Sequence, residues 1–145
     1  MYRAVDSNGN TLDFLLTDKR DTAAAERFLC KVLKAFHTTE PRIINVDKNA
    51  AYPKAIDALK AKKELLLKVE LRQNKSLNQR IEQDHRFIKW LVKPGMGFKS
   101  FDTARRTIKS YEIMHMLKKG QIETVNKGAV KERIKFISEI FGVIA

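Results

Sequence analysis

Two acidic residues stand where carboxylates could act together on a phosphate-bearing substrate. Asp47 ends the apolar run Ile43–Asp47, which predicts a short buried strand, and Glu82 lies in a helical pattern after the next predicted strand. In α/β proteins ligands gather at the carboxyl ends of strands, so a strand-end aspartate and a helical glutamate can meet there. Carboxylate oxygens suit Mg²⁺ or Mn²⁺, and two such ions can activate an attacking oxygen and stabilise a leaving one in phosphoryl transfer. The pair therefore predicts a metal site built on Asp47 and Glu82.

Each of these residues also has a simpler structural interpretation. Asp47 could cap the helix that follows it, since aspartate is common at helix N-termini. Glu82 could form an exposed ion pair with Arg86, four residues later on the same helix. His85 is interpreted as structural, because no HxxH motif or cysteine ligand accompanies it. Taken singly, the two carboxylates do not decide between a metal site and ordinary helix chemistry.

Alternating strand and helix patterns must position the two carboxylates. The chain opens with two β-prone runs, Tyr2–Val5 and Thr11–Leu16, around an Asn-Gly pair, which predicts a β-hairpin. Asp6 lies in that turn, where its expected role is to stabilise the turn backbone. Apolar spacing and capping residues predict the other elements: a helix over 22–36, strands over 43–47 and 65–71, and helices over 52–62, 76–90, 101–119 and 129–141. This order predicts an α/β domain followed by a helical tail.

The charge distribution favours a polyanionic partner. The 145 residues carry 29 Lys and Arg against 17 Asp and Glu, which gives a net charge of +12. Residues 73–145 contribute +8 of this charge, and residues 1–72 contribute +4. Nucleic acid is the usual partner of such a basic surface, although a surface that is merely solvated is the alternative.

The cysteine content and the apolar runs bear on where the protein acts. Cys30 is the single cysteine, so no internal disulfide can form, which favours a reducing cytosol and a cytoplasmic location. Its place among apolar residues of a helical pattern predicts buried packing rather than a nucleophile. No apolar run approaches the roughly 20 residues of a membrane span. The N-terminus also lacks the apolar region of a signal peptide, so no membrane partner is expected.

The spacing of the two carboxylates forms a specific pattern. The 34 residues 48–81 separate Asp47 from Glu82, and Lys89 follows seven residues later, two turns along the same helical face. This pattern resembles the D-34-E signature with a following lysine of DDE transposases and retroviral-type integrases. Within that group the chain is similar to the transposases of small bacterial insertion sequences. The segments that carry the resemblance are, in order, Asn45–Pro53, Leu77–Lys89, Phe98–Ile108 and Met114–Gln121.

The resemblance covers residues 2–121 and implies both a fold and a reaction. The implied fold is ribonuclease-H-like (the integrase catalytic core), lacking its first strand and followed by a C-terminal helical tail. The expected domains are a partial catalytic core over 1–121 and a helical extension over 122–145. Members of the family nick DNA at element ends and join the freed 3′-hydroxyl to a target phosphodiester, using two Mg²⁺ or Mn²⁺ ions. In this chain Asp47 would be the second acidic ligand and Glu82 the third.

The resemblance also implies which basic residues contact DNA. Lys89 would approach DNA near the reacting ends, and Arg86, on the same helical face, would touch phosphate. Four further candidates lie on the next helix or just before it: Lys99, Arg105, Arg106 and Lys109. The alternative is that these charges only solvate the outer faces of their helices. The implied partners are element-end and target DNA, and this chain itself or a full-length transposase.

The chain departs from the family pattern at its beginning. The first catalytic aspartate is expected one strand upstream of Tyr2, together with a helix-turn-helix, and Asp6 is a poor substitute because it belongs to the hairpin turn. We therefore expect a truncated and catalytically inactive copy, since a missing strand removes a metal ligand and leaves a sheet edge unpaired. Two other functions stay open. One is a non-catalytic DNA-binding or regulatory fragment, and the other is a related metal-dependent nuclease such as a ribonuclease H.

Overall fold

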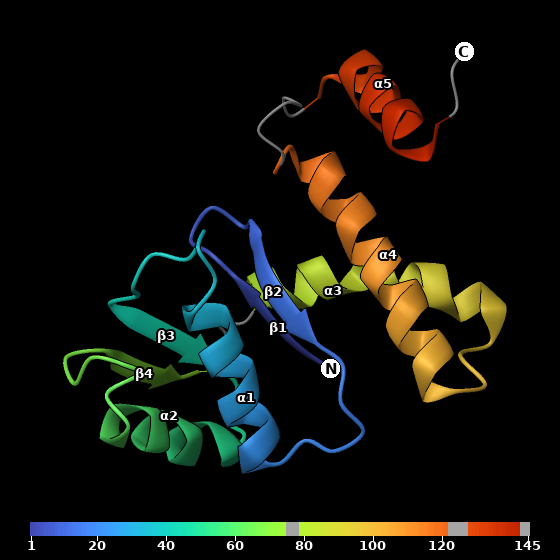
Figure 1. Cartoon of the computed structure of the whole chain (residues 1–145). Helices are drawn as coiled ribbons and strands as arrows, with labels where there is room; N and C mark the ends of the chain where they lie inside the picture. Colours follow the sequence, from blue (N-terminus) through green and yellow to red (C-terminus); the bar gives the residue numbers. More distant parts are fainter. Residues whose placement is uncertain (75–78, 122–127, 143–145) are drawn as a thin grey trace. The chain divides into compact units, whose positions relative to one another are not determined.

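A β-hairpin opens the chain in the computed structural model, which describes residues 1–74, 79–121 and 128–142 (Figure 1). Strand β1 (Tyr2–Val5) pairs antiparallel with β2 (Thr11–Leu15), and Tyr2 lies opposite Leu15. A carboxylate oxygen of Asp6 accepts hydrogen bonds of 2.8 Å from the backbone N–H groups of Asn8 and Asn10. Gly9 adopts a φ of 85°, the left-handed region that glycine enters without steric cost. The predicted hairpin and the turn-stabilising role of Asp6 are confirmed.

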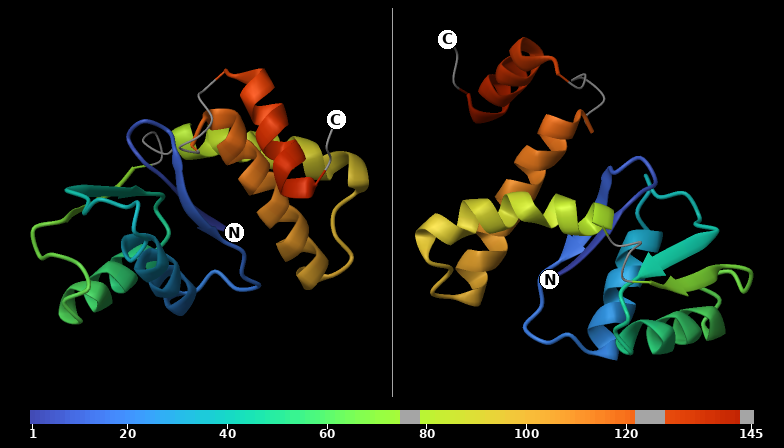
Figure 2. Two further views of the ribbon diagram at one scale, coloured as in Figure 1. Left: turned by 45° about the horizontal axis from the view of Figure 1, so that its top comes forward. Right: turned by 180° about the vertical axis from the view of Figure 1, so that it is seen from behind.

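The second pair of strands is parallel. Strand β3 (Ile43–Val46) pairs with β4 (Glu70–Gln73), with Ile43 opposite Glu70 and Val46 opposite Gln73. Among the described residues the two pairs form separate two-stranded sheets, which Figure 2 shows as two distinct ribbons. Within the part of the chain that the structure describes, no strand pairing joins β1 to β3.

The strand predicted over residues 65–71 is wrong in its first half. Leu65 and Val69 are buried in the core, whereas Leu67 is 80% exposed. The N–H of Val69 donates to the carbonyl of Leu66, which closes a turn instead of extending a ladder. Because of this turn, Leu65 and Val69, four residues apart, can both pack into the core. Pairing with β3 therefore begins only at Glu70.

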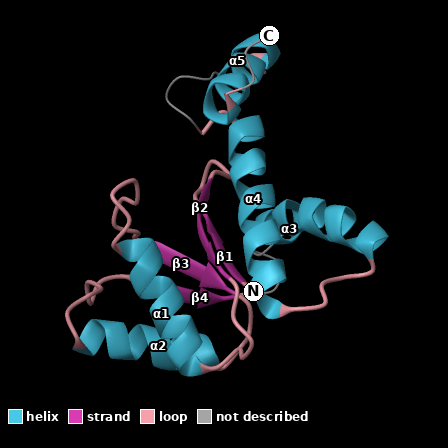
Figure 3. Ribbon diagram, turned by 45° about the vertical axis from the view of Figure 1, so that its right-hand side comes forward, coloured by secondary structure: helices cyan, strands magenta, loops and turns pink. Residues whose placement is uncertain are grey.

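Two helices cover the strands of the first part of the chain. Helix α1 (Thr22–Leu33) begins at Asp21, whose carboxylate accepts from the N–H of Ala24 at 2.8 Å, and helix α2 (Ala51–Ala61) packs beside it (Figure 3). Helix α1 ends three residues before the predicted Phe36, which is fully exposed. The buried core combines both helices with the strands and the turn before β4: Tyr2, Ala24, Ala25, Phe28, Leu29, Val32, Ala51, Ala55, Ile56, Leu59, Leu65 and Val69. Cys30 packs against this core but is half-buried, less than the buried packing that its apolar setting predicts, and it is a free cysteine.

The rest of the described chain is helical. Helix α3 (Gln79–Val92) leads into a short 3₁₀ turn, and helix α4 (Phe101–Lys119) starts at Ser100 and ends at Gly120, whose φ of 72° suits a helix C-cap. Helix α5 (Val130–Phe141) is the predicted terminal helix. The start predicted for α3 at residue 76 lies outside the described residues.

The chain divides into two compact units, Met1–Lys89 and Trp90–Ala145. Of the elements that the structure describes, the first unit holds the four strands with α1, α2 and most of α3, and the second holds α4 and α5. The predicted α/β class is confirmed at this coarse level. The division predicted after residue 121 stays a prediction. None of the described helices combines the length and the apolar character that crossing a membrane requires.

Candidate functional site

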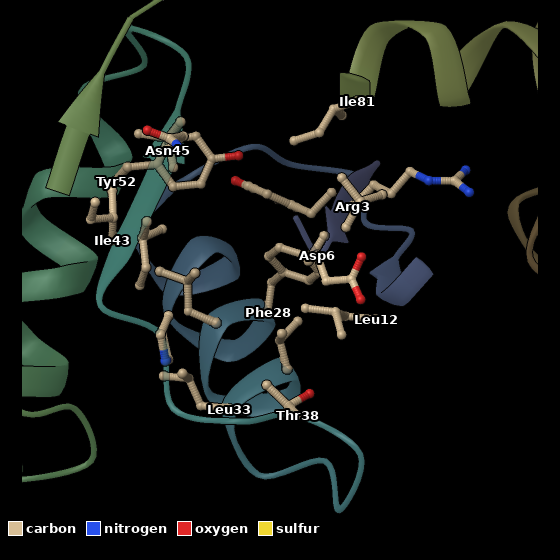
Figure 4. A pocket seen from close by; sticks show the side chains of 18 of the residues that line it. Arg3, Asp6, Leu12, Phe28, Leu33, Thr38, Ile43, Asn45, Tyr52 and Ile81 are labelled. Atoms are coloured by element: carbon tan, nitrogen blue, oxygen red, sulfur yellow. The ribbon is translucent and has the colours of Figure 1, made fainter. Parts of the chain in front are cut away.

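A large cavity opens in the first unit between strands β1 and β3. Its volume is about 1280 Å³, and every residue of both strands lines it. In Figure 4, Ile43 and Asn45 of β3 lie on one side and Arg3 and Leu12 of the hairpin on the other. Phe28 of α1 lies at its base, and Ile81 of α3 lies above it. The cavity therefore has strands on two sides and a helix on each of the other two.

The two predicted catalytic carboxylates both line this cavity. Asp47 directly follows β3, and Glu82 lies in the first turn of α3. Two residues with 34 others between them in the sequence thus line one cavity. The structure places both residues that the sequence singled out on the wall of one cavity.

Asp47 does not have the helix-capping role that was its alternative. The N-cap of α2 is Ala50, which makes no side-chain capping bond. The Oδ1 of Asp47 instead accepts from the N–H of Asn49 at 3.0 Å, which orders the turn between β3 and α2. Its Oδ2 lies 3.5 Å from an Nη of Arg20. One carboxylate oxygen is thus used to shape the turn, and the other faces a cation.

Arg20 is a site residue that the sequence reasoning missed. Its guanidinium carbon lies 5.5 Å from the centre of the Tyr2 ring, in a cation–π contact, while the side chain reaches Asp47. It precedes the α1 cap Asp21 in a basic loop, which resembles an ordinary solvated segment, so nothing in the local pattern marks it. Only the packing of the hairpin beside β3 reveals its partner.

The pKa of Tyr52 is affected by the negative charge of Asp47. Burial, followed by the negative charge of Asp47, raises the pKa of the Tyr52 phenol to about 12. Tyr52 also contacts Tyr2 edge-to-face, with ring centroids 6.0 Å apart. The tyrosine is therefore protonated at neutral pH and forms a polar, uncharged wall beside the carboxylate.

A buried ion pair ties α3, which carries Glu82, to the hairpin. Arg3 and Asp84 are joined at 2.5 Å, and their side chains are 0% and 12% exposed. Arg3 also donates to the hydroxyl of Thr11 at 3.1 Å and lies over the ring of Phe87 at 5.5 Å. Because neighbouring strand residues point to opposite faces, Tyr2 faces α1 and Arg3 faces α3. Nothing in the local sequence pattern marks this pair.

The other predicted residues of α3 have distinct surroundings. Burial and the nearby Arg3 cation lower the pKa of His85 to about 4, so this cavity-lining histidine is neutral at pH 7. Within the described part of the chain no ion pair joins Glu82 to Arg86, and the Glu82 side chain is exposed. Arg86 and Lys89 are exposed.

The remaining predicted DNA-contacting residues belong to the second unit. Lys99 lies just before α4, and Arg105, Arg106 and Lys109 lie on it. All four side chains are exposed. They are accessible to a polyanion, as the prediction requires.

The cavity wall carries carboxylates, which are suitable ligands for a divalent cation, but few of them. Carboxylate oxygens are the preferred ligands of Mg²⁺, which keeps several waters and is held by one or two carboxylates. Asp47 and Glu82 match that description. No cluster of three His, Cys, Asp or Glu side chains occurs among the described residues.

Comparison with known proteins gives a consistent result. A family model described as a DDE domain matches residues 1–121. The transposase of the insertion sequence-like element IS431mec and that of element IS257 in transposon Tn4003, both from Staphylococcus aureus, are each 35% identical over 123 residues. Each match covers 82% of this chain and 50% of the relative, so the chain spans about half the length of these relatives. The search of solved structures found no match.

The family match extends over most of the chain and contains both carboxylates that line the cavity. The spacing of those carboxylates and the similarity to named transposases point the same way. The chain belongs to the DDE transposase family of bacterial insertion sequences.

Proposed function

We propose that this chain forms part of a transposase that cuts and joins DNA by metal-dependent phosphoryl transfer. Asp47 and Glu82 would hold Mg²⁺ or Mn²⁺ through their oxygens. The metal would polarise the phosphodiester and lower the pKa of the attacking hydroxyl. The observation that carries the proposal is that Asp47 and Glu82, far apart in sequence, line one cavity in a chain of the DDE family.

The proposed fold of the first unit is the ribonuclease-H-like core. An antiparallel hairpin, a helix, a parallel pair of strands with an intervening helix, and a carboxylate-bearing helix follow one another in the expected order. Asp47 directly follows β3, at the carboxyl edge where α/β sheets bind ligands. In this fold Asp47 would lie after a strand and Glu82 in the first turn of the following helix, both facing the cavity.

The proposed DNA contacts come from exposed cations on two helices. Arg86 and Lys89 follow Glu82 along α3 at intervals of four and seven residues, so they lie on the same side of that helix. Lys99, Arg105, Arg106 and Lys109 would add phosphate contacts from α4 and its start. Phosphate contacts position a protein on DNA without reading its sequence. Recognition of the element ends would need other residues.

The test is a DNA-joining assay on a polypeptide long enough to compare with the relatives. This chain replaces the matched half of the IS257 transposase, and joining of labelled element-end DNA to a plasmid is measured with Mg²⁺. Asp47→Asn and Glu82→Gln should each lower the joining rate by more than about 100-fold, because even residues one shell away from a metal cost 10–100-fold. DNA binding should be retained.

Matched controls separate loss of the metal site from loss of charge. Asp57→Asn on α2 and Glu132→Gln on α5 remove exposed carboxylates that do not line the cavity. Both should leave the joining rate within about twofold, since such exposed positions contribute little to stability. Full joining activity in Glu82→Gln would refute the proposed role of this glutamate.

A further inference from the structure

The β-hairpin has one edge that faces away from its partner strand. Strand β2 pairs with β1 on one side, and among the residues that the structure describes no strand pairs with its other side, called here the outer edge. A strand edge without a neighbour presents N–H and C=O groups that can pair with a strand of another chain. The side chains at the outer edge therefore determine whether the hairpin can join a second sheet.

Both backbone groups of Phe14 on the outer edge already have side-chain partners. In an antiparallel ladder, alternate residues direct their N–H and C=O groups away from the paired strand. The N–H of Phe14 donates to Oδ1 of Asp13 at 2.7 Å, and its carbonyl accepts from Nζ of Lys31 at 3.1 Å. The Lys31 ammonium also donates to the same Asp13 oxygen at 2.7 Å. The three residues thus form a closed cluster at the edge of the strand.

The setting of Lys31 fits protection of this edge better than a contribution to stability. It lies in the last turn of α1, and its ammonium is 5.7 Å from the centre of the Phe14 ring. The Lys31 side chain is 52% exposed, and ion pairs with such exposure add little stability. Lysine is also a residue by which natural sheets prevent pairing at an exposed edge.

A second side chain binds the outer edge near Leu12. The Nε2 of His37 donates to the carbonyl of Leu12 at 2.9 Å, since a carbonyl can only accept. A turn after α1 holds His37 there, and in this turn the N–H of Thr38 donates to the carbonyl of Ala35 at 2.9 Å. The turn follows directly from the end of α1 at Leu33, earlier than the sequence pattern predicts. The early helix end therefore positions the histidine over β2.

The strand is also irregular along the same stretch. The register of β1 against β2 shifts between Ala4 and Val5. Their partners are Asp13 and Thr11, which leaves Leu12 as one extra residue on β2. Such a bulge increases the local twist, and bulges of this kind make an edge less suited to pairing. The bulge and the bound side chains thus affect the same part of the outer edge.

We propose that Asp13, Lys31 and His37 form an edge-protecting cluster that prevents a second copy of this chain from adding to β2 by strand pairing. The protected segment, Thr11–Leu16, carries Asp13 as its one charged residue. Short apolar segments of high β-propensity and low charge pair readily with identical copies of themselves. A second copy is therefore the occupant expected at an unprotected outer edge. The proposal is independent of the proposed function, because it uses neither carboxylate of the cavity.

The test compares the unchanged 145-residue protein with the triple variant Asp13→Ala, Lys31→Ala and His37→Ala. Amide hydrogen exchange is read by NMR from low micromolar to about 1 mM protein, the range in which unpaired strand edges associate. In the unchanged protein, exchange of the Phe14 amide should be independent of protein concentration. In the triple variant it should slow by about fivefold or more at the highest concentration, because the amide then pairs with a second copy. Sedimentation velocity should show association of the triple variant over the same range.

Two further variants separate edge protection from general effects of charge and folding. Asp57→Ala, Arg27→Ala and Lys54→Ala together remove one acidic and two basic side chains from exposed helix positions. This matched variant should behave like the unchanged protein. Lys31→Met removes the ammonium but keeps an apolar stem, so the fold should be retained. It should show the same slowing of Phe14 exchange as the triple variant, to a smaller extent.

Three results would overturn the proposal. Slower Phe14 exchange at high concentration in the unchanged protein would mean that the outer edge already pairs, and this result requires no variant. Exchange that stays independent of concentration in the folded triple variant and in Lys31→Met would mean that these side chains do not protect the edge. Slowing confined to the amides of β4 would place the association on the other sheet.

Discussion

At the scale of single residues, the chemistry around Asp47 depends on what occupies its second oxygen. One oxygen accepts from the N–H of Asn49, and the other faces Arg20 at 3.5 Å. The Arg20 cation therefore offsets part of the Asp47 charge. The Arg20 and Asp47 side chains are 49% and 43% exposed, so their attraction is screened by water and remains weak.

Removing the Arg20 charge should therefore favour metal binding. We expect Arg20→Gln to tighten Mn²⁺ binding by up to about fivefold, because exposed ion pairs contribute only about 0.2–1 kcal/mol. The measurement is the Mn²⁺ dissociation constant from electron paramagnetic resonance at low ionic strength. Arg27→Gln, which removes an exposed arginine of α1 outside the cavity, is the matched control and should change nothing. Weaker Mn²⁺ binding in Arg20→Gln would show that the arginine supports the site instead of competing with the metal.

At the scale of elements, the position of α3 decides whether Glu82 reaches the cavity. The ion pair of Arg3 with Asp84 joins this helix to the strand β1 on the face opposite α1. Arg3 has no exposed side-chain surface, so its charge is balanced inside the protein and not by water. Such pairs add little net stability compared with apolar residues, but removing one partner is costly.

Loss of the anchor should be visible as a loss of stability. We expect Asp84→Asn to lower the free energy of unfolding by about 3–5 kcal/mol, because the Arg3 cation then stays buried without its counter-charge. Urea denaturation followed by circular dichroism measures the change, and Asp57→Asn on the exposed face of α2 is the control. The double variant Arg3→Met with Asp84→Leu should recover most of the loss, since it removes both charges together. A loss of less than 1 kcal/mol in Asp84→Asn would mean that α3 is held by other contacts.

At the scale of the whole molecule, the net charge of +12 is the main indication of its partner. The second compact unit carries much of the basic excess, and Arg105, Arg106 and Lys109 project from α4 into solvent. Exposed cations of this kind attract nucleic acid at long range and release counterions on binding. The salt dependence of DNA affinity therefore reports directly on how many of them contact phosphate.

The α4 cations give a quantitative expectation. Replacing Arg105, Arg106 and Lys109 with glutamine should make the slope of log affinity against log salt shallower by up to about 2.7, which is about 0.9 for each lost contact with duplex DNA. Fluorescence anisotropy with a labelled duplex at several salt concentrations gives the slope. The control variant replaces three exposed lysines of the first unit, Lys54, Lys63 and Lys68, with glutamine. If both triple variants change the slope equally, binding follows net charge alone and α4 is not a specific contact surface.

The local sequence determined the elements and the two carboxylates. The Asn-Gly turn fixes the hairpin, Asp21 and Gly120 mark helix ends, and the interval from Asp47 to Glu82 identifies the family. These features are predictable because capping, turn formation and apolar periodicity act between residues that are near neighbours in the chain. The turn at residues 65–69 escaped prediction because consecutive leucines fit a strand equally well until the core selects which of them to bury.

Only the tertiary structure decided which residues surround the carboxylates. Arg20 and Asp47 are partners because the loop before α1 lies beside the end of β3, and Arg3 and Asp84 are partners because α3 covers the hairpin face. Neither pairing follows from composition or spacing, since it depends on packing between segments up to 81 positions apart. The cavity between β1 and β3 likewise appears only in the folded chain, because the two strands that line it are far apart in the sequence. The sequence therefore singled out the two carboxylates, and the packing of distant segments decided their surroundings.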